Sequence, residues 1–129
     1  MNIGEIARRS DLPTKTVRYY ADVGLVKPSG RTEAGYRVYD DKTLRKLIFV
    51  RRSRAMGFSV AECRKLLNLY EDHSRASSEV RSIAKQHLVK IDAKLSELQN
   101  LQKELSMLVD CCHGDDRPDC PILDALERG

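Results

Sequence analysis

The sequence predicts a mainly α-helical protein with an N-terminal winged helix-turn-helix domain, a long dimerisation helix, and a short C-terminal loop and helix. Three observations support this fold class. Short helical patterns separated by turn residues fill the first half of the chain, a long heptad pattern follows, and a turn-rich segment with three cysteines ends it. We place the boundaries of these parts at residues 1–75, 76–110 and 111–129.

The start of the chain has the pattern of two short helices joined by a tight turn. The apolar spacing of residues 3–7 predicts the first helix, and residues 11–13 interrupt it with a proline. Thr14 is the expected N-cap of a second helix over residues 15–21, because a threonine hydroxyl can accept a backbone hydrogen bond at that position. Such a pair of helices is typical of a helix-turn-helix motif.

The pattern changes over residues 25–39, which we predict to form a wing beside the two helices. Pro28, Gly30 and Gly35 interrupt the helical spacing, and residues 36–39 alternate as a strand does. These features together indicate a small β-hairpin.

Two further helices are expected after the wing. Asp40 or Asp41 caps the third helix. Ser59 and Glu62 have the spacing of a capping box, which predicts the start of the fourth helix. Cys63 lies inside that helix with no second thiol near it in sequence, so we expect it to be a small core residue.

Apolar residues spaced alternately four and three apart mark the longest predicted helix, from about Ser78 to Val109. At 1.5 Å per residue this helix would be roughly 48 Å long. It could pack against its own domain, but we favour a coiled coil with a second copy of the chain, which predicts a homodimer. The seam consists of Val80, Ala84, His87, Ile91, Lys94, Leu98, Leu101, Leu105 and Leu108.

Charge is divided unevenly along the chain. The net charge is +4, but residues 1–75 carry 16 Lys and Arg against 9 Asp and Glu, whereas residues 76–129 carry 7 against 10. A basic first part is typical of a module that binds DNA. No apolar stretch approaches the roughly 20 residues of a membrane span, and the N-terminus has no secretory signal. We therefore expect a cytoplasmic protein with no membrane partner.

The motifs of common enzymes are absent from the sequence. It has no glycine-rich phosphate loop and no His-Glu pairing at the metalloprotease spacing. Its neighbouring cysteine and histidine residues lie in a loop-like tail rather than in a pocket. We therefore expect that the protein is not an enzyme.

The basic half supplies side chains that suit contact with DNA. A recognition helix in the major groove needs hydrogen-bond donors on its first turns, and tyrosine and arginine on a wing suit contacts to phosphate and sugar. One of Tyr19 and Tyr20 is expected in the core, and Arg51 and Arg52 can equally form a solvated helix face. The residues that we expect at the DNA are Lys15, Thr16, Arg18, Tyr20, Arg31, Tyr36 and Arg37.

The C-terminal segment concentrates soft metal ligands within ten residues: Cys111, Cys112, His113 and Cys120. Thiolates select Cu(I), zinc or heavier soft metals, and zinc could in principle use all four residues. Adjacent cysteines rarely bind one ion, so we favour a two-thiolate site of Cys112 and Cys120, which suits Cu(I), Ag(I) or Au(I). A redox sensor that uses the vicinal cysteines is an alternative. Pro121 predicts a short helix whose N-terminal dipole would favour the Cys120 thiolate.

Several of these segments resemble motifs of the MerR family of transcription regulators, and the order of helices and the cysteine-bearing tail are similar along the whole chain. The tail is most similar to the copper-sensing, CueR-like branch of that family. The segments that carry the resemblance are residues 2–7 (NIGEIA), 16–20 (TVRYY), 24–26 (GLV), 35–39 (GYRVY) and 54–59 (RAMGFS), and the tail over residues 112–123.

The resemblance implies a dimeric activator, joined by an antiparallel coiled coil, that stays on its promoter with and without metal. Metal binding would distort the spacer of the promoter DNA and so bring the two elements that RNA polymerase recognises into register. The implied inducer is Cu(I), with Ag(I) and Au(I) as alternatives, and the implied targets are genes of copper efflux and detoxification.

The resemblance also implies roles for residues around the metal. Cys112 and Cys120 are the implied ligands. Relatives that sense divalent metals carry a further cysteine at the start of the dimerisation helix, where this sequence has Ser77. Apart from the resemblance, we expect the partner's Arg81 to help balance the charge of two thiolates, because Cys112 lies near the C-terminal end of the long helix, where the dipole opposes an anion. A sensor of Zn(II), Hg(II) or Cd(II), or a thiol redox sensor of the same family, is the alternative, because the tail holds a thiol and an imidazole beyond a minimal copper tail.

Overall fold

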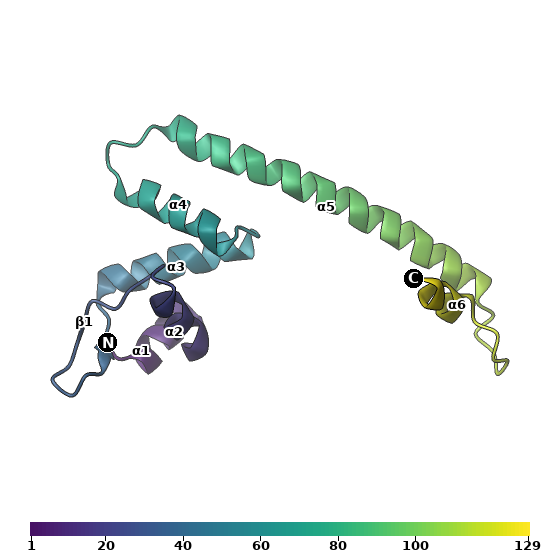
Figure 1. Ribbon diagram of the computed structural model, residues 1–129, viewed down its shortest axis with the longest axis horizontal. Helices are drawn as coiled ribbons and strands as arrows, with labels where there is room; N and C mark the ends of the chain where they lie inside the picture. The colour runs from purple at the N-terminus through teal and green to yellow at the C-terminus, as the bar shows by residue number, and fades with distance from the viewer. The chain divides into compact units, whose positions relative to one another are not determined.

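The computed structural model describes the whole chain, residues 1–129, as two compact units, Met1–Val80 and Arg81–Gly129. The chain is mainly helical with one two-stranded hairpin (Figure 1), which confirms the predicted fold class. No helix is both long and apolar enough to cross a membrane. The elements are α1 (Ile3–Ser10), α2 (Thr14–Asp22), β1 (Gly30–Arg31), β2 (Arg37–Val38), α3 (Asp41–Ala55), α4 (Val60–Glu71), α5 (Ser77–Cys111) and α6 (Pro121–Arg128).

The helix-turn-helix forms as predicted, apart from one cap. The side chain of Asn2 accepts a hydrogen bond of 2.8 Å from the backbone of Glu5 and so caps α1. Asp11 ends α1 with a left-handed backbone, at φ 58°, and its N–H bonds back to the last turn. The prediction that Thr14 is the N-cap of α2 is wrong. Pro13 occupies that position, because its restricted φ leads directly into the helix, and Thr14 is already helical.

The predicted wing is present as a short antiparallel hairpin. Gly30 pairs with Val38, and Arg31 pairs with Arg37. Gly35 in the connecting loop has a φ of +88°, a conformation that residues with a Cβ rarely adopt, and this glycine lets the loop turn tightly.

Local caps start the two helices that follow the wing. Asp40 caps α3 by accepting hydrogen bonds of 2.8 Å from both the backbone N–H and the hydroxyl of Thr43. Asp41 is therefore the first helical residue rather than the cap. At the start of α4, Glu62 N–H donates to the Ser59 hydroxyl (3.1 Å) and Ser59 N–H donates to the Glu62 carboxylate (3.0 Å), which confirms the capping box.

The core of the first unit lies among its four helices. α1 packs against α2 and α3, and α3 packs against α4. Cys63 is fully buried on α4, and its burial raises the pKa of the thiol, as expected for a core residue. The buried apolar residues are Ile6, Ala7, Val17, Tyr20, Leu25, Val26, Tyr39, Leu47, Val50, Phe58, Cys63 and Leu67.

The second unit consists of most of α5 together with α6. α5 is slightly longer than the heptad pattern predicts. Three of its four seam leucines are exposed in the single chain: Leu98 at 62%, Leu101 at 52% and Leu105 at 53%. The fourth, Leu108, is half-buried. His87, itself a member of the predicted seam, is the only buried residue of this unit, so most of the apolar stripe has no cover within one chain.

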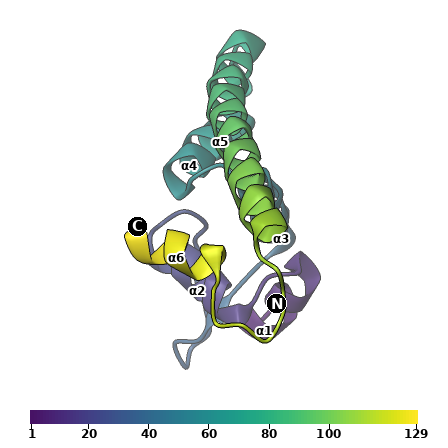
Figure 2. The ribbon, with the colours of Figure 1, turned by 90° about the vertical axis from the view of Figure 1, so that its right-hand side faces the viewer.

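α6 lies beside the last turns of α5 (Figures 1 and 2). It begins at Pro121, in the first helical position that the sequence predicts for this proline. Leu105 and Leu108 of α5 and Leu126 of α6 line a cavity of about 360 Å³ between the two helices. The C-terminal helix therefore extends the apolar surface of α5 instead of closing it.

Candidate functional site

The helix α2 and the wing meet around a surface cavity of about 650 Å³. Arg18 and Asp22 line it from α2, and Tyr36 and Arg37 line it from the wing. Three of the residues that the sequence assigns to DNA, Arg18, Tyr36 and Arg37, are thus gathered at one opening. The structure brings together donors from a helix and from a wing, which is the combination that a duplex requires of this motif.

The predicted DNA residues differ in how far they reach into solvent. Tyr36 has 74% of its surface exposed. Thr16 and Arg37 are half-buried. The exposed members of the set are Lys15, Arg18, Arg31 and Tyr36.

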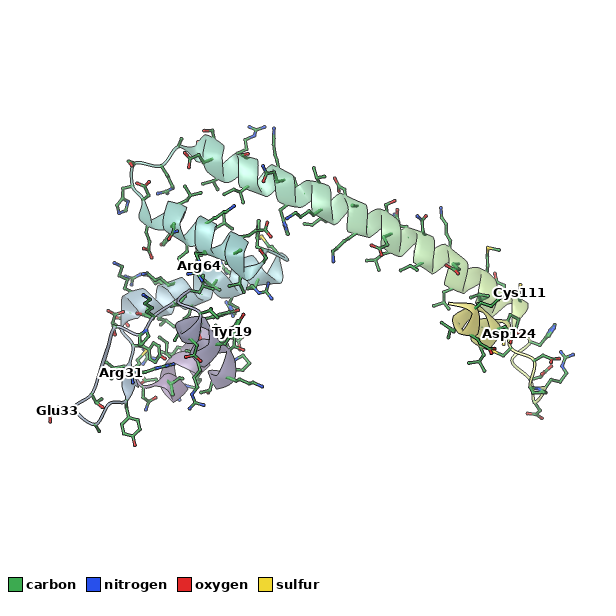
Figure 3. The ribbon with its side chains drawn as sticks, in the orientation of Figure 1. Tyr19, Arg31, Glu33, Arg64, Cys111 and Asp124 are labelled. Atoms are coloured by element: carbon green, nitrogen blue, oxygen red, sulfur yellow. The ribbon has the colours of Figure 1, made fainter.

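The structure corrects the choice between the two adjacent tyrosines of α2. Tyr20 is only 5% exposed and packs in the core, so it is not placed to contact DNA. Tyr19 is 50% exposed, and Figure 3 shows it on the outside of the helix. We therefore replace Tyr20 by Tyr19 in the candidate set. Adjacent residues of a helix point about 100° apart, and here Tyr20 faces the core while Tyr19 faces solvent.

Arg31 supports the shape of the wing. Its Nη1 donates a hydrogen bond of 2.8 Å to the carbonyl of Gly35, and the N–H of Tyr36 donates to the Thr32 hydroxyl at 3.1 Å. Figure 3 shows Glu33 at the outer edge of the same loop. Arg31 therefore holds the loop that presents Tyr36.

Asp22 is a site residue that sequence reasoning missed. Its Oδ1 accepts a hydrogen bond from Nη2 of Arg37 at 3.0 Å, and this bond raises the pKa of the Arg37 guanidinium. The two residues are 15 positions apart, and no local pattern pairs them. Only the position of Asp22 at the end of a predicted helix, before a predicted wing, could have drawn attention to it.

Arg64 of α4 is a second residue that the sequence did not single out. Its Nη2 donates to the carbonyl of Val23 at 2.8 Å and its Nη1 donates to the carbonyl of Gly24 at 3.0 Å. α2 has no basic residue in its last turn, so this guanidinium serves the C-terminal carbonyls instead. It thereby fixes the end of α2 to α4.

The arginines of α3 divide between structural bonds and solvent. Arg51 pairs with Asp11 at 3.3 Å, and Arg54 donates to the carbonyl of Phe58 at 2.8 Å. Arg52 is exposed. The sequence allows Arg51 and Arg52 to form a solvated helix face. Of the three arginines, only Arg52 fits that description.

The candidate metal loop joins the end of α5 to the start of α6. Cys111 is the last residue of α5 and is exposed, whereas Cys112 and Cys120 are half-buried. Cys120 is the N-cap residue of α6. The single chain forms no group of three or more His, Cys, Asp or Glu side chains that could hold a metal ion. The donors are therefore two partly shielded thiols at the ends of a loop, with an exposed thiol beside one of them.

Ser77 and Arg81 lie at the other end of the long helix. Ser77 is the first residue of α5, Arg81 follows one turn later, and both are exposed. The 35 residues of α5 span about 52 Å. A helix of this length keeps Ser77 far from Cys111 in one chain, so only a second chain could bring the two ends together.

A winged helix-turn-helix with cationic side chains on its helix and wing is typical of DNA-binding proteins, and the fold assigns this chain to that class. Residues 1–69 match the family described as MerR HTH family regulatory protein, and residues 44–108 match the family described as MerR, DNA binding. The chain therefore belongs to the MerR family of transcription regulators.

Similar proteins match along nearly the whole chain. The chain is 56% identical over 129 residues to the HTH-type transcriptional regulator HmrR of Rhizobium leguminosarum bv. viciae, covering 100% of this chain and 99% of that protein. It is 40% identical over 126 residues to CueR of Salmonella typhimurium, covering 98% and 91%. The crystal structure of PbrR691 from Ralstonia metallidurans CH34 in complex with lead(II) superposes with a TM-score of 0.79 at 35% identity, covering 98% of each chain. HmrR thus stands nearer to this sequence than CueR does.

Proposed function

We propose that this protein binds promoter DNA as a homodimer and activates genes of copper efflux and detoxification when Cu(I), or alternatively Ag(I) or Au(I), binds Cys112 and Cys120. The observation that carries the proposal is the pair of half-buried thiols at the two ends of the loop between α5 and α6. The lead(II) complex of PbrR691, a protein of similar structure, supports a heavy-metal inducer.

The DNA-binding half of the proposal rests on the cavity between α2 and the wing. Lys15 and Arg18 are exposed on the first turns of α2, where a major-groove helix presents its donors. Tyr36 and Arg37 lie across the cavity on the wing, where they suit phosphate and sugar. Helix and wing would then engage the base edges and the backbone of one half-site.

The homodimer is supported by the uncovered stripe of α5. A helix that exposes Leu98, Leu101 and Leu105 to water leaves a large apolar surface unburied. Antiparallel pairing of two α5 helices would bury this stripe and bring Ser77 and Arg81 of one chain toward the Cys112 end of the other. Two DNA-binding units joined in this way would hold two half-sites of a promoter read by RNA polymerase.

The donor set fits a monovalent soft ion. Two thiolates are soft ligands, and Cu(I), Ag(I) and Au(I) accept two of them. Cys120 stands at the N-terminus of α6, where the helix dipole favours an anionic sulfur. A bound ion would link the end of α5 to the start of α6. We infer that Cys112 and Cys120 hold this ion, and that the loop and α6 become ordered against the dimer on binding.

A divalent soft metal is the second candidate inducer. Cys111 is exposed directly beside Cys112, and His113 follows, so further ligands are at hand. PbrR691 was crystallised in complex with lead(II), so a divalent ion is a reasonable alternative for a chain of similar structure. A thiol redox response through Cys111 and Cys112 is the remaining alternative.

The deciding experiment is transcription from the cognate promoter with reduced protein titrated by Cu(I), Ag(I), Zn(II) and Hg(II). We expect activation by Cu(I) and Ag(I). Cys112→Ser and Cys120→Ser should each bind the operator normally and lose activation, since one thiolate cannot close a two-coordinate site. Cys111→Ser and Cys63→Ser are the matched controls and should retain most of the response. Activation by Zn(II), with Cys111 or His113 essential, would overturn the monovalent assignment.

Ser77→Cys tests the selectivity from the opposite direction. It offers a third sulfur from the partner subunit and should admit Hg(II) or Zn(II) as inducers. An unchanged metal response in this variant would show that Ser77 does not face the bound ion.

A further inference from the structure

We propose that Asp22 is a positioning residue that sets the preference of this protein for its operator over other DNA, by holding Arg37 of the wing. The proposal rests on the DNA-binding function proposed above. It assigns a role to an acidic residue that lies among the cations of the candidate interface.

The wing needs support from outside its own ladder. Its strands have two residues each, and a hairpin of this size is marginal by itself. On one side of the ladder, the N–H of Tyr39 donates to the carbonyl of Met1 at 2.8 Å. Toward the loop, the Asp22–Arg37 ion pair joins the wing to α2. This pair therefore fixes the direction of the wing relative to the recognition helix.

Arg37 keeps donors for DNA while Asp22 holds it. A guanidinium carries five N–H donors in a planar fork, and the hydrogen bond from Nη2 to Asp22 uses one of them. The Arg37 side chain is 28% exposed and lines the cavity beside Tyr36. Arg37 is thus presented to a phosphate with its rotamer already selected, which lowers the entropy lost on binding.

The charge of Asp22 acts against its positioning effect. Its side chain is 62% exposed at the same cavity as Arg18, so its carboxylate repels phosphate in any sequence. The positioning effect operates only where the wing meets the DNA backbone in register with α2. The charge of Asp22 lowers affinity for every DNA sequence, whereas its hold on Arg37 raises affinity for the operator alone. The net result is a higher ratio of operator affinity to affinity for other DNA.

The test compares two duplexes at fixed salt. One duplex is selected by the wild-type homodimer from a random-sequence library, and the other is a scrambled duplex of the same length and composition. For Asp22→Asn we expect affinity for the scrambled duplex to rise by about twofold, because one repulsive charge is lost. Affinity for the selected duplex should fall by about three- to tenfold, because Arg37 loses its holding partner.

Asp11→Asn is the matched control. Asp11 also pairs with an arginine, Arg51, and its removal changes the net charge by the same amount. Asparagine tolerates the left-handed backbone of this position. Both affinities of Asp11→Asn should shift by the same factor. If Asp22→Asn behaves as Asp11→Asn does, the effect is charge alone and the inference is overturned.

A double-mutant cycle with Arg37→Met shows whether Asp22 acts through Arg37. In the Arg37→Met background, Asp22→Asn should no longer lower affinity for the selected duplex, and a continued loss overturns the inference. If the circular dichroism of Asp22→Asn shows that its helices are lost, Asp22→Glu is tested instead. The Asp22→Glu substitution keeps the negative charge but moves the carboxylate away from its position beside Arg37. An unchanged affinity ratio in Asp22→Glu then also counts against the proposal. A wild type that prefers no duplex would instead overturn the DNA-binding function itself.

Discussion

The two units of the chain differ in what each can bury without help. Met1–Val80 holds every buried apolar side chain of the protein, gathered among four helices and a hairpin. Arg81–Gly129 buries only His87 and exposes most leucines of α5 and both leucines of α6. The first unit therefore has the core of an independent domain, whereas the second has half of an interface.

This difference can be followed spectroscopically, because the aromatic residues are divided in the same way. The protein has no Trp, and all five tyrosines lie in the first unit, at positions 19, 20, 36, 39 and 70. Tyrosine fluorescence therefore reports unfolding of Met1–Val80 alone, whereas far-ultraviolet circular dichroism reports all helices. The following variants use the two signals to separate the units.

Leu98→Asp should have the largest effect, and it should fall on the second unit. A carboxylate placed in the seam of a symmetric dimer is buried twice, at a cost of several kcal/mol per dimer. Sedimentation should report monomer, and operator affinity should collapse because two half-sites are no longer held together. Tyrosine fluorescence should stay native-like. Ser96→Asp, on the opposite face of α5, should remain dimeric, and a dimeric Leu98→Asp would place the seam elsewhere.

Leu47→Ala should act on the first unit instead. Leu47 has no exposed surface, and truncation of a fully buried leucine costs about 3 kcal/mol in transfer and cavity terms. The urea midpoint followed by tyrosine fluorescence should fall accordingly, while sedimentation under native conditions still reports a dimer. Val89→Ala, at 69% exposure on α5, is the control and should leave the midpoint nearly unchanged. Equal effects of the two variants would contradict a core confined to the first unit.

The sequence predicts most of this fold because its decisive signals are local. Asp40 and Thr43 are three residues apart, as are Ser59 and Glu62, so each cap can be found within one turn. The heptad spacing likewise predicts α5 with small errors at its ends. The sequence predicts the cap of α2 at the wrong residue and does not decide between Asp40 and Asp41 for the cap of α3, because the first residue of a helix depends on backbone geometry that composition does not determine.

The candidate site is less predictable because its bonds join distant segments. The pair Asp22–Arg37 spans 15 positions, and the bonds from Arg64 to the end of α2 span about 40. Tyr19 and Tyr20 are chemically alike, and only the packing of α2 in the assembled domain, which includes its contact with α1, decides which of them is buried. Such contacts follow from the assembled fold rather than from any short pattern.

Arg18→Ala should separate DNA binding from dimerisation. Loss of one charge-assisted contact from the exposed face of α2 should weaken operator binding by about 1–3 kcal/mol. Sedimentation and both spectroscopic signals should match the wild type, since Arg18 is exposed and takes no part in the core. An unchanged operator affinity at physiological salt would show that Arg18 is an ordinary surface residue.

Asp40→Asn should give the smallest effect, an acid dependence confined to the first unit. The backbone N–H and the hydroxyl of Thr43 donate to Asp40 and hold its pKa below the unfolded value of about 3.9. The resulting stabilisation is complete above that value and is lost as the pH falls through the lower, folded pKa. The asparagine introduced by this substitution would be a neutral cap without this dependence.

The measurement is urea unfolding by tyrosine fluorescence between about pH 6 and about pH 2.5. Wild type should be more stable than Asp40→Asn near pH 6, and the difference should shrink toward the acid end. Thr43→Val removes only the hydroxyl bond and keeps the backbone bond, so the acid-dependent part of its stability should be intermediate. If the unfolding free energies of wild type and Asp40→Asn change with pH in parallel, the pKa of Asp40 is the same in the folded and unfolded states. The Asp40 cap would then stabilise α3 as a neutral acceptor does, without the added strength of a charged one.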